Sequence, residues 1–481
     1  MLFSSKVFLF AFLPIVLFLY YAVGKTVKEK YRTVYRNVLL FISSLVFYAA
    51  DNLYFLSVML LSITANWLFG MAIDKYKDTK KAKTMLVLSL VFNLGMIFVF
   101  KYLSFTVANI NSLFNTSLAV PKISLPLGIS FFTFQSISYV ADVYRKKVDA
   151  QRSFYHVGLY ISLFPQLIAG PIVRYKTVAD EIDNRKIDLS LFSDGVCRFI
   201  IGLCKKVLIA NTTALIADAA FAQSDLSMPF AWLGAVSYTL QIYFDFSGYS
   251  DMAIGLGRMF GFHFEENFNF PYIARSVTDF WRRWHISLSS WFRDYVYIPL
   301  GGNRCSKARE IFNLFIVWLL TGIWHGAAWN FIIWGLFYFV IILFERTFPK
   351  KYIDKNAKPK LPHRMIGHIL TLICVISAWV LFRAESLSAA MSYLGSMFAG
   401  KAEFDIMFLR YFSENKLFLI CGILFSMPIS KIPRPNENGK DSKIVNAAFG
   451  ILYPVLLSAG FILACAYIVK GSYNPFIYFN F

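Results

Sequence analysis

Long apolar stretches, separated by short polar ones, run through almost the whole chain. A helix that crosses a membrane needs about 20 largely apolar residues, because its length must match the hydrocarbon layer. By that rule we expect helices at 7–23, 38–50, 53–73, 84–103, 127–141, 154–169, 196–216, 229–257, 311–322, 327–346, 366–383, 416–430 and 446–469. The stretches 38–50 and 311–322 are short enough to be half-helices or re-entrant segments. The pattern predicts an all-α, polytopic membrane protein with about 10 to 13 transmembrane or re-entrant helices.

The polar connections predict the orientation of these helices. An excess of Lys and Arg in short loops marks the cytoplasmic side of a membrane. The positive charge near the first apolar stretch lies mostly behind it, so we expect a retained spanning helix and no cleaved signal peptide. Basic runs just inside the first and last helices place both termini on the extracytoplasmic side. The runs that favour the cytoplasm lie at 75–83, 145–152, 350–364 and 431–443.

The composition agrees with a membrane protein and excludes several other classes. Of the 481 residues, 57% are hydrophobic and only 16% are charged, and the mean hydropathy is +0.55. Lys and Arg exceed Asp and Glu by 48 to 28, but these cations form no basic stripe for a nucleic acid. The six scattered cysteines lack the paired spacing of zinc or redox motifs. We expect one polytopic domain over 1–481 that contacts the lipid bilayer, and the lack of an inverted repeat argues against a secondary transporter.

One histidine lies in or beside a predicted membrane helix. His325 is found in the sequence TGIWHGAAWN at 321–330. Ionisable groups at membrane depth are rare and often functional, and imidazole exchanges protons near neutral pH. Gly322 and Gly326 are four residues apart, so backbone or substrate can approach His325 closely on that face. The alternative, a helix-packing GxxxG with a satisfied core histidine, is equally compatible with this stretch alone.

The stretch 279–297 is amphipathic and is predicted not to span the membrane. Its apolar residues recur every three or four positions, so they form one helical face suited to the membrane interface. They are Trp281, Trp284, Leu288, Trp291 and Tyr295. Arg282 and Arg283 lie elsewhere on the helix, and Arg283 can pair with Asp279 one turn away. His285, in this polar cluster, is a candidate to orient His325 or to bind an acyl donor.

Two carboxylates lie within or beside the apolar stretch 229–257. Asp245 and Asp251 need compensation there, because a buried carboxylate without a partner is very costly. The expected partners are arginines, from among Arg174, Arg258, Arg282 and Arg283. A structural ion pair explains each aspartate at least as well as catalysis does. Gln241 is one helical turn from Asp245 and is predicted to face the same polar cavity.

Several motifs resemble the bacterial alginate O-acetylase branch of the membrane-bound O-acyltransferases. The most specific are DFWRRWHISLSSWFRDYVYIPLGGNR at 279–304 and GIWHG at 322–326. FFTFQSISYVADVYR at 131–145, LFPQLIAGPIVRY at 163–175 and FDFSGYSDMAIGLGRMFGF at 244–262 follow the family's order. The resemblance covers about 120–345, the motif-bearing core. It implies the family's all-helical fold, a catalytic role for His325 and a second functional histidine at His285. We expect the buried and neighbouring polar residues to form a supporting network, which comprises Gln241, Asp245, Asp251, Arg282, Arg283 and Asn330.

The resemblance also implies a reaction and its setting. An acetyl group would pass from a cytosolic thioester, acetyl-CoA, across a bacterial inner membrane to the hydroxyls of a polysaccharide. A separate extracytoplasmic polysaccharide acetyltransferase is the expected partner. We expect no permanently bound cofactor and no metal, because His285 and His325 have no carboxylate at a recognised ligand spacing. The other histidines, His156, His263, His363 and His368, match no motif with an assigned role.

The tail at 472–481 offers a candidate acyl carrier. Its ending, NPFIYFNF, resembles the tails of related envelope-acylating systems, in which a tyrosine has been proposed to carry the acyl group outward. Tyr478 is that tyrosine here, and its phenol needs a base to act as a nucleophile at neutral pH. The alternative is an aromatic belt at the membrane interface.

Three other functions remain open from the sequence. A related family branch transfers D-alanine to teichoic acids from a carrier protein. The motifs RRWHISLSSW and IPLGGNR and the greater length of the chain favour the acetylases. A polysaccharide transporter, or a scaffold for an extracellular acetyltransferase, would be non-enzymatic. A scaffold has no reason to bear the cost of buried histidines and carboxylates.

Overall fold

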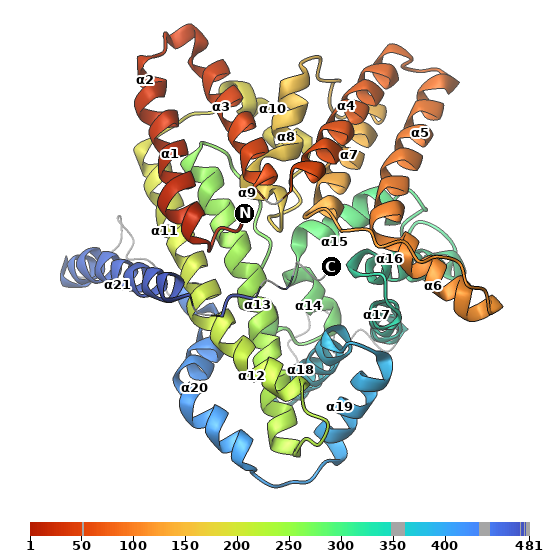
Figure 1. Ribbon diagram of the computed structural model, residues 1–481, viewed down its shortest axis with the longest axis vertical. Coiled ribbons are helices and arrows are strands. Elements are labelled where there is room, and N and C mark those ends of the chain that lie inside the picture. The colour runs from red at the N-terminus through yellow and green to blue at the C-terminus, as the bar shows by residue number, and fades with distance from the viewer. Residues whose placement is uncertain (51, 348–360, 432–442, 472, 476, 478–481) are drawn as a thin grey trace. The chain divides into compact units, whose positions relative to one another are not determined.

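The computed structural model describes residues 1–50, 52–347, 361–431, 443–471, 473–475 and 477 (Figure 1). The regular secondary structure of these residues consists of helices, without strands. The predicted all-α class is therefore confirmed. The chain divides into two compact units, which we call unit 1 (Met1–Phe199 with Met252–Glu265) and unit 2 (Ile200–Asp251 with Glu266–Phe481). The single polytopic domain over 1–481 stays a prediction.

Unit 1 begins with a continuous helical run over Phe8–Thr26, which includes α1 (Leu13–Phe18), the π-helical turn η2 (Leu19–Val23) and α2 (Gly24–Thr26). The helices that follow are α3 (Glu29–Ala49), α4 (Leu53–Lys75), α5 (Lys80–Ile97), α6 (Leu103–Phe114), α7 (Ile129–Tyr144), α8 (Phe154–Ser162), α9 (Phe164–Leu167), α10 (Tyr175–Asn184) and the first part of α11 (Leu189–Cys204).

Buried polar contacts hold the helices of unit 1 in register. Asn66 on α4 and Asn93 on α5 exchange two amide hydrogen bonds, of 3.1 and 2.7 Å. The stretch 154–169, predicted as one helix, is broken at Leu163, because Pro165 in the next turn has no backbone N–H to donate. The free N–H of Phe164 donates to Ser44 Oγ at 3.0 Å instead.

Unit 2 contains most of the long helix α13 and the two motifs at 279–304 and 322–326. After the π-helical turn η4 (Lys205–Ala210), its helices are α12 (Asn211–Phe221), α13 (Met228–Met259, which ends in unit 1), α14 (Val277–Arg283), α15 (Ile286–Phe292), α16 (Lys307–His325), α17 (Trp329–Thr347), α18 (Leu361–Arg383), α19 (Leu387–Ala399), α20 (Ile406–Phe425) and α21 (Lys443–Lys470). The short stretches 38–50 and 311–322 belong to the longer helices α3 and α16, neither of which is among the candidate membrane spans, so their half-helical or re-entrant character stays a prediction.

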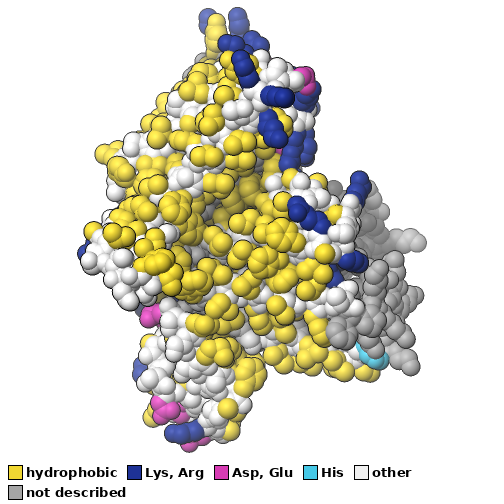
Figure 2. All heavy atoms as spheres, turned by 90° about the vertical axis from the view of Figure 1, so that its right-hand side faces the viewer, with side chains coloured by type: hydrophobic (Ala, Val, Ile, Leu, Met, Phe, Trp, Pro, Cys, Tyr) yellow, Lys and Arg dark blue, Asp and Glu magenta, His cyan; other side chains and the backbone are white. Residues whose placement is uncertain are grey.

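Seven helical segments of the described residues are long and apolar enough to cross a membrane. They are Phe8–Thr26, Leu53–Lys75, Lys80–Phe114, Leu189–Phe221, Trp329–Thr347, Leu361–Arg383 and Gly450–Lys470. Figure 2 shows one face on which hydrophobic side chains cover a broad area, with Lys and Arg gathered toward an edge. The chain is thus a multi-pass membrane protein, as the apolar pattern predicts.

Candidate functional site

His325 is the last residue of α16 and lies in an aromatic cage. Only 7% of its surface is exposed. The imidazole ring meets Trp334 of α17 edge-on at 4.9 Å between centroids and Phe382 of α18 at 5.0 Å. Trp324, its neighbour in α16, is 4.8 Å away. Three helices therefore enclose the imidazole in apolar surroundings that exclude bulk water.

The helix pair α16 and α17 brings the cage together by close backbone packing. A Cβ at Gly322 would lie 2.5 Å from the Phe331 carbonyl oxygen, and one at Gly335 would lie 2.5 Å from the Trp318 carbonyl oxygen. Only glycine allows such an approach. A Cβ at Gly326 would meet the Phe331 ring at 2.3 Å. The structure thus places Gly322 and Gly326 against α17, as helix packing would require.

Asn330 fixes the third side of the cage. Its amide Nδ2 donates to the Ala384 carbonyl oxygen at 2.8 Å, just beyond the end of α18. The last carbonyls of a helix lack partners within the helix, so this bond ties the start of α17 to the end of α18. Phe382, two residues from Ala384, is held beside His325 as a result.

His285 lies at a sharp bend, which the sequence does not predict. The expected continuous helix over 279–297 is wrong: α14 ends at Arg283, and His285 adopts a left-handed backbone with φ +44° before α15. The aromatic residues of this stretch are also placed differently from the prediction. Trp281 and Trp284 are buried and pack against Trp318 and Trp379, at 4.9 Å between centroids in each case. They build protein core and do not present an interfacial face to lipid.

A buried amide organises the surroundings of His285. The Oδ1 of Asn267 accepts hydrogen bonds from the Ser287 backbone N–H at 3.2 Å and from Ser287 Oγ at 2.9 Å, and it lies 3.2 Å from His285 Nδ1. Its Nδ2 donates to Ser250 Oγ at 3.1 Å. Because the backbone N–H can only donate, the oxygen of the amide must face it. His285 Nδ1 therefore carries the proton, and Nε2 is the basic nitrogen.

His285 is a neutral imidazole in this environment. It lies outside the seven candidate spans, and burial lowers its pKa to about 3. Its ring meets Phe246 edge-on at 4.6 Å and lies 6.0 Å from the Trp324 ring, which in turn contacts His325. The two histidines are thus neighbours across one indole, from segments 40 residues apart in the sequence.

Asp245 forms a buried ion pair with a lysine that the sequence analysis did not consider. Lys206 Nζ lies 2.8 Å from Asp245 Oδ1, and the two side chains are 3% and 2% exposed. The prediction of an arginine partner for Asp245 is therefore wrong. Gln241, one turn away on α13, is also buried, and its Oε1 receives no hydrogen bond from the described residues.

The other predicted polar residues lie in separate contacts. Asp251 Oδ2 accepts from Lys205 Nζ at 2.6 Å. Arg283 pairs with Asp279 at 3.1 Å, which confirms the predicted contact one turn away. Arg282 is exposed. The structure therefore brings His285 near His325, whereas Arg282 is exposed and Arg283 is partly exposed in its pair with Asp279.

The segment that follows α21 lies against the same buried pair. The backbone N–H of Ile477 donates to Asp245 Oδ2 at 3.0 Å, and Lys206 Nζ donates to the Pro475 carbonyl oxygen. Asn211 Nδ2 donates to Asn474 Oδ1 at 3.3 Å. We call this arrangement the tail seat. Tyr478, the predicted acyl carrier, lies outside the described residues.

A second ion pair holds the start of the tail. Tyr473 Oη donates to Asp218 Oδ2 at 2.6 Å, and Asp218 Oδ1 pairs with Arg383 at 2.6 Å. The hydrogen bond to Asp218 is the main reason that the pKa of Tyr473 rises to about 12. Residues 473–475 and 477 thus contact other parts of unit 2 at two places, Asp218 and the pair of Lys206 and Asp245.

Sequence reasoning missed several of these groups. Lys205 and Lys206 lie inside the predicted span 196–216, where a cation is as unusual as a carboxylate, so this signal was present in the sequence. Asn267 lies in a polar loop and gave no such signal. Within the described ranges, no three His, Cys, Asp or Glu side chains gather as metal ligands would.

Comparison with known proteins connects this geometry to a family. The family model for MBOAT, the membrane-bound O-acyltransferase family, matches residues 1–388. The chain is 45% identical to the "Probable alginate O-acetylase" of Pseudomonas syringae pv. tomato, over 83% of this chain and 75% of that one. It is 39% identical to the protein of the same name from Azotobacter vinelandii, over the full length of both.

A peptidoglycan O-acetyltransferase of Helicobacter pylori is 35% identical over 82% of this chain and 80% of its own. The family match extends through all the segments that build the histidine cage and the His285 bend. This chain therefore belongs to the membrane-bound O-acyltransferase family and is a multi-pass membrane enzyme that transfers acyl groups to oxygen.

Proposed function

We propose that the enzyme takes an acetyl group from cytosolic acetyl-CoA and passes it across a bacterial inner membrane for O-acetylation of a polysaccharide. The observation that carries the proposal is His325, a nearly buried imidazole in an aromatic cage at the end of α16. The printed names of the relatives, alginate O-acetylases and a peptidoglycan O-acetyltransferase, supply the acetyl group and the class of acceptor. The predicted topology, with both termini outside, belongs to the same proposal.

His325 serves as the general base of the reaction. Its unprotonated ring nitrogen takes the proton of an acceptor hydroxyl while the oxygen attacks the thioester carbonyl carbon. A C–O bond forms, the C–S bond breaks, and the thiolate of coenzyme A leaves and takes up the proton. Such proton transfer contributes about 10² to 10⁴ in rate. The aromatic walls keep out water, which would otherwise compete as the acceptor.

The indole of Trp334 is suited to stabilise the developing oxyanion. It is fully buried beside His325, and its Nε1–H has no acceptor among the described residues. A preorganised donor aimed at the thioester oxygen gains strength in a water-excluded site. His285, uncharged and anchored by Asn267, lies close enough to help bind the acyl donor without adding a buried charge.

The donor itself stays on the cytoplasmic side. Coenzyme A carries several phosphate charges, which cannot enter hydrocarbon without a prohibitive desolvation cost. Only the acetyl group has to reach the outer side, so the transfer occurs inside the protein. A partner acetyltransferase outside the membrane then completes the transfer to sugar hydroxyls.

Tyr478 is the proposed relay that carries the acetyl group outward. Ile477, the residue directly before it, is held through its backbone N–H by Asp245 inside unit 2. The tail seat supports the proposal because it holds Ile477, the residue before Tyr478 in the sequence, at a buried polar site of unit 2. The acetyl ester on the Tyr478 oxygen would then be the substrate of the extracytoplasmic partner.

A donor assay tests this proposal. Purified protein receives labelled acetyl-CoA, and acetyl-CoA consumption and peptide mass are followed in wild type, His325→Ala, Trp334→Phe and Tyr478→Phe. His368→Ala is the matched control, because His368 lies on α18 and contacts the Ala274 carbonyl oxygen at 2.9 Å. We expect label on Tyr478 in wild type and control, its loss in His325→Ala and Tyr478→Phe, and a decrease of about 10²-fold or more in Trp334→Phe.

The outcomes separate the parts of the proposal. Unchanged donor turnover in His325→Ala would refute the assignment of the base. Turnover of acetyl-CoA without label on Tyr478 would support acetyl transfer by the enzyme but refute the relay role of Tyr478. The tail would then have only a structural role. Label from a D-alanyl carrier protein, and none from acetyl-CoA, would move the enzyme to the teichoic-acid branch.

A further inference from the structure

Two arginines of unit 1 lie against one buried tyrosine, and a third arginine is one helical turn from the first of them. Arg32 and Arg36 are one turn apart on α3, and Arg185 directly follows α10. The guanidinium carbon of Arg36 lies 5.0 Å from the ring centroid of Tyr20, and that of Arg185 lies 5.8 Å from it. Tyr20, in η2 near the end of the first helical run, is fully buried. We call these four residues the arginine cluster.

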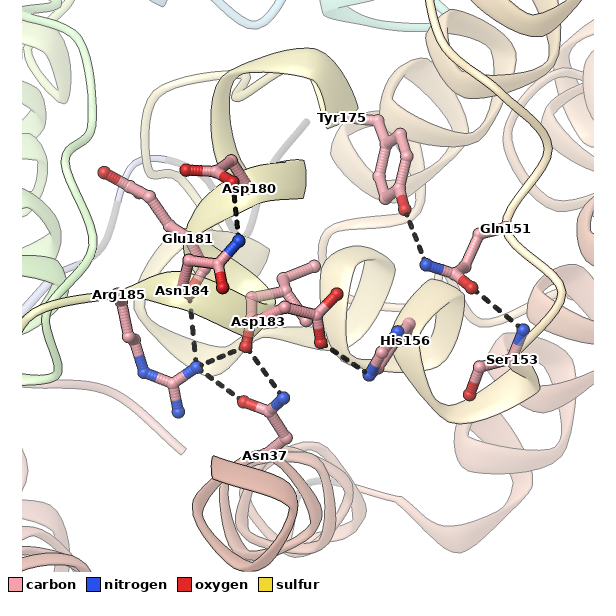
Figure 3. Close-up of polar contacts among 11 residues, drawn as sticks. Asn37, Gln151, Ser153, His156, Tyr175, Asp180, Glu181, Asp183, Asn184 and Arg185 are labelled. Carbon is pink, nitrogen blue, oxygen red and sulfur yellow. Dashed lines mark hydrogen bonds and ion pairs between the residues drawn. The ribbon is translucent and has the colours of Figure 1, made fainter. Parts of the chain in front are cut away.

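Several hydrogen bonds fix the guanidinium of Arg185, and one of its nitrogens remains without an acceptor among the described residues. Figure 3 shows its guanidinium at the end of α10, where Nη1 donates to Asn37 Oδ1 at 2.6 Å and to the Ile182 carbonyl oxygen at 2.8 Å. Its Nε donates to Tyr20 Oη at 2.9 Å. The remaining nitrogen, Nη2, is buried and has no acceptor among the described residues.

Arg32 and Arg36 have still fewer partners. Arg36 forms no hydrogen bond or ion pair with the part of the chain that the structure describes, and its Nε is buried. Arg32 donates once, to the Val27 carbonyl oxygen at 3.4 Å, and its Nε is likewise buried without an acceptor. Buried donors without acceptors are rare in folded proteins, so three in one cluster require an explanation.

The nearby carboxylates are engaged elsewhere. Glu181 contacts His263 Nδ1 at 2.6 Å, and Asp183 lies 3.5 Å from His156 Nε2, as Figure 3 shows for the second pair. Burial, followed by the charges of Arg185 and Arg32, lowers the pKa of Arg36, which precedes the apolar stretch 38–50 of α3. The cluster thus holds concentrated positive charge that the described residues do not neutralise.

We propose that the arginine cluster is a binding site for an anionic phosphate group. Arginine presents a planar fork of donors that matches phosphate oxygens, and Arg36 stacked on Tyr20 is preorganised to receive one. The cluster lies where the first spanning segment ends, among Lys25, Lys28 and Lys30, which the distribution of basic residues predicts to be cytoplasmic. Basic pockets at this level take up phospholipid headgroups, and the same chemistry would take up the phosphates of coenzyme A.

A binding experiment on the full-length protein tests the site. Delipidated protein in detergent is titrated with phosphatidylglycerol or zwitterionic phosphatidylcholine, and with coenzyme A or pantetheine, which lacks phosphate. Binding is followed by native mass spectrometry and thermal unfolding. The test variant is Arg32→Gln with Arg36→Gln. The matched control is Lys80→Gln with Lys83→Gln, which removes two exposed cations from the first turn of α5.

We expect an anionic probe to bind wild type and control equally and to bind the double arginine variant about tenfold more weakly. Preference for phosphatidylglycerol over phosphatidylcholine identifies a lipid headgroup, and preference for coenzyme A over pantetheine identifies the donor. The variant loses one long hydrogen bond of Arg32 and the stacking of Arg36 on Tyr20, so without a probe it should still unfold in one cooperative transition, and this checks that it folds. Equal affinity of the arginine variant, or no preference for either anionic probe in wild type, would overturn the proposal.

Discussion

The two histidines of the candidate site differ in what surrounds their rings. His325 has aromatic neighbours on three helices, whereas His285 faces a fixed amide acceptor. An imidazole whose one nitrogen is committed to a hydrogen bond keeps a fixed tautomer. His285 is therefore suited to hold a position, and His325 is the better candidate to gain and lose a proton during turnover.

The depressed pKa of His285 predicts how stability depends on pH. The folded state keeps His285 neutral down to about pH 3, whereas an unfolded histidine takes up a proton near pH 6.5. The unfolded state therefore binds more protons below pH 6.5, and this contribution to stability falls as the pH decreases, by at most about 1.4 kcal/mol per pH unit. Between pH 7 and pH 5, the melting temperature of wild type should decrease more than that of His285→Asn, in which asparagine tolerates the left-handed backbone.

The exposed His363 provides the control for this measurement. His363→Asn also removes an imidazole, but it leaves the buried His285 and its contribution to stability in place. A His285→Asn variant that loses as much stability as wild type on acidification would contradict the buried, neutral state of His285.

The buried pair of Lys206 and Asp245 predicts a strong coupling between two substitutions. Asp245→Asn leaves the Lys206 ammonium without its carboxylate at 3% exposure, and breaking a buried pair in this way costs about 3–5 kcal/mol. Adding Lys206→Met removes the stranded charge, so the double variant should regain much of the loss. Thermal unfolding of the two single variants and the double variant measures the coupling, and additive losses would show that the pair is not buried as described.

The residues that sequence reasoning could find share one property. His285, His325, Asp245 and Asp251 are ionisable groups in or near apolar segments, and their cost there marks them. Asn267 escaped because a neutral amide in a polar loop costs nothing by itself. Its importance arises only when folding brings it to Ser287 and His285, 18 to 20 residues further along the chain.

At the level of helices, the tight pair of α16 and α17 predicts a clear effect of one methyl group. Gly322→Ala would place a Cβ 2.5 Å from the Phe331 carbonyl oxygen, which is rigid backbone. The helices would have to separate, at a cost of about 1–3 kcal/mol, and Trp334 would move away from His325. We expect a lower melting temperature together with lower acetyl-CoA turnover.

Gly395→Ala is the matched control for this substitution. Gly395 lies inside α19, and a Cβ there would meet nothing within 4 Å. Alanine is favoured over glycine in a helix by roughly 0.5–1 kcal/mol, so this variant should be unchanged or slightly more stable. Equal destabilisation of both variants would mean that the close contact at Gly322 does not hold the pair.

The helices could be predicted from the sequence where they coincide with long apolar runs. Helix ends that depend on tertiary contacts could not be predicted in this way. The repeat of aromatic residues in 279–297 is compatible with one helix, and local sequence contains nothing that forbids it. The break at His285 depends on Asn267, whose backbone carbonyl oxygen accepts from the Ile286 N–H at 3.0 Å. The loop that contains Asn267 thus accepts a hydrogen bond that would otherwise lie within the helix. Hydrophobic periodicity does not predict such a contact with a distant segment.

At the scale of the whole molecule, composition and motifs were sufficient for the fold class, the membrane location and the family. The division into two units and the tail seat were not accessible in that way. Ile477 and Asp245 are 232 residues apart, and a tail with mostly apolar side chains resembles any membrane-interface belt. Only the folded chain shows that its backbone returns to a buried ion pair.

The anchors on either side of Pro475 predict that the length of the tail matters. Inserting one glycine after Pro475 changes the number of residues between Asn474, held by Asn211, and Ile477, held by Asp245. We expect at least a tenfold decrease of acetyl label on Tyr478, while hydrolysis of acetyl-CoA continues. The same insertion after Gly471 precedes all these anchors and should have little effect. Equal labelling of the two insertion variants would show that the seat does not position the tail.

The hydrogen bonds of the tail seat involve the Pro475 carbonyl oxygen and the Ile477 N–H, which are main-chain atoms. The side chains at these two positions can therefore change in evolution while the hydrogen bonds remain. A proline at position 477 is an exception, because it would remove the N–H and with it the hydrogen bond to Asp245. What evolution has to preserve is the count of residues and the paired charges of Lys206 and Asp245. In divergent members of the family, a docked tail would be recognised by its spacing and its buried pair long after its sequence had ceased to be recognisable.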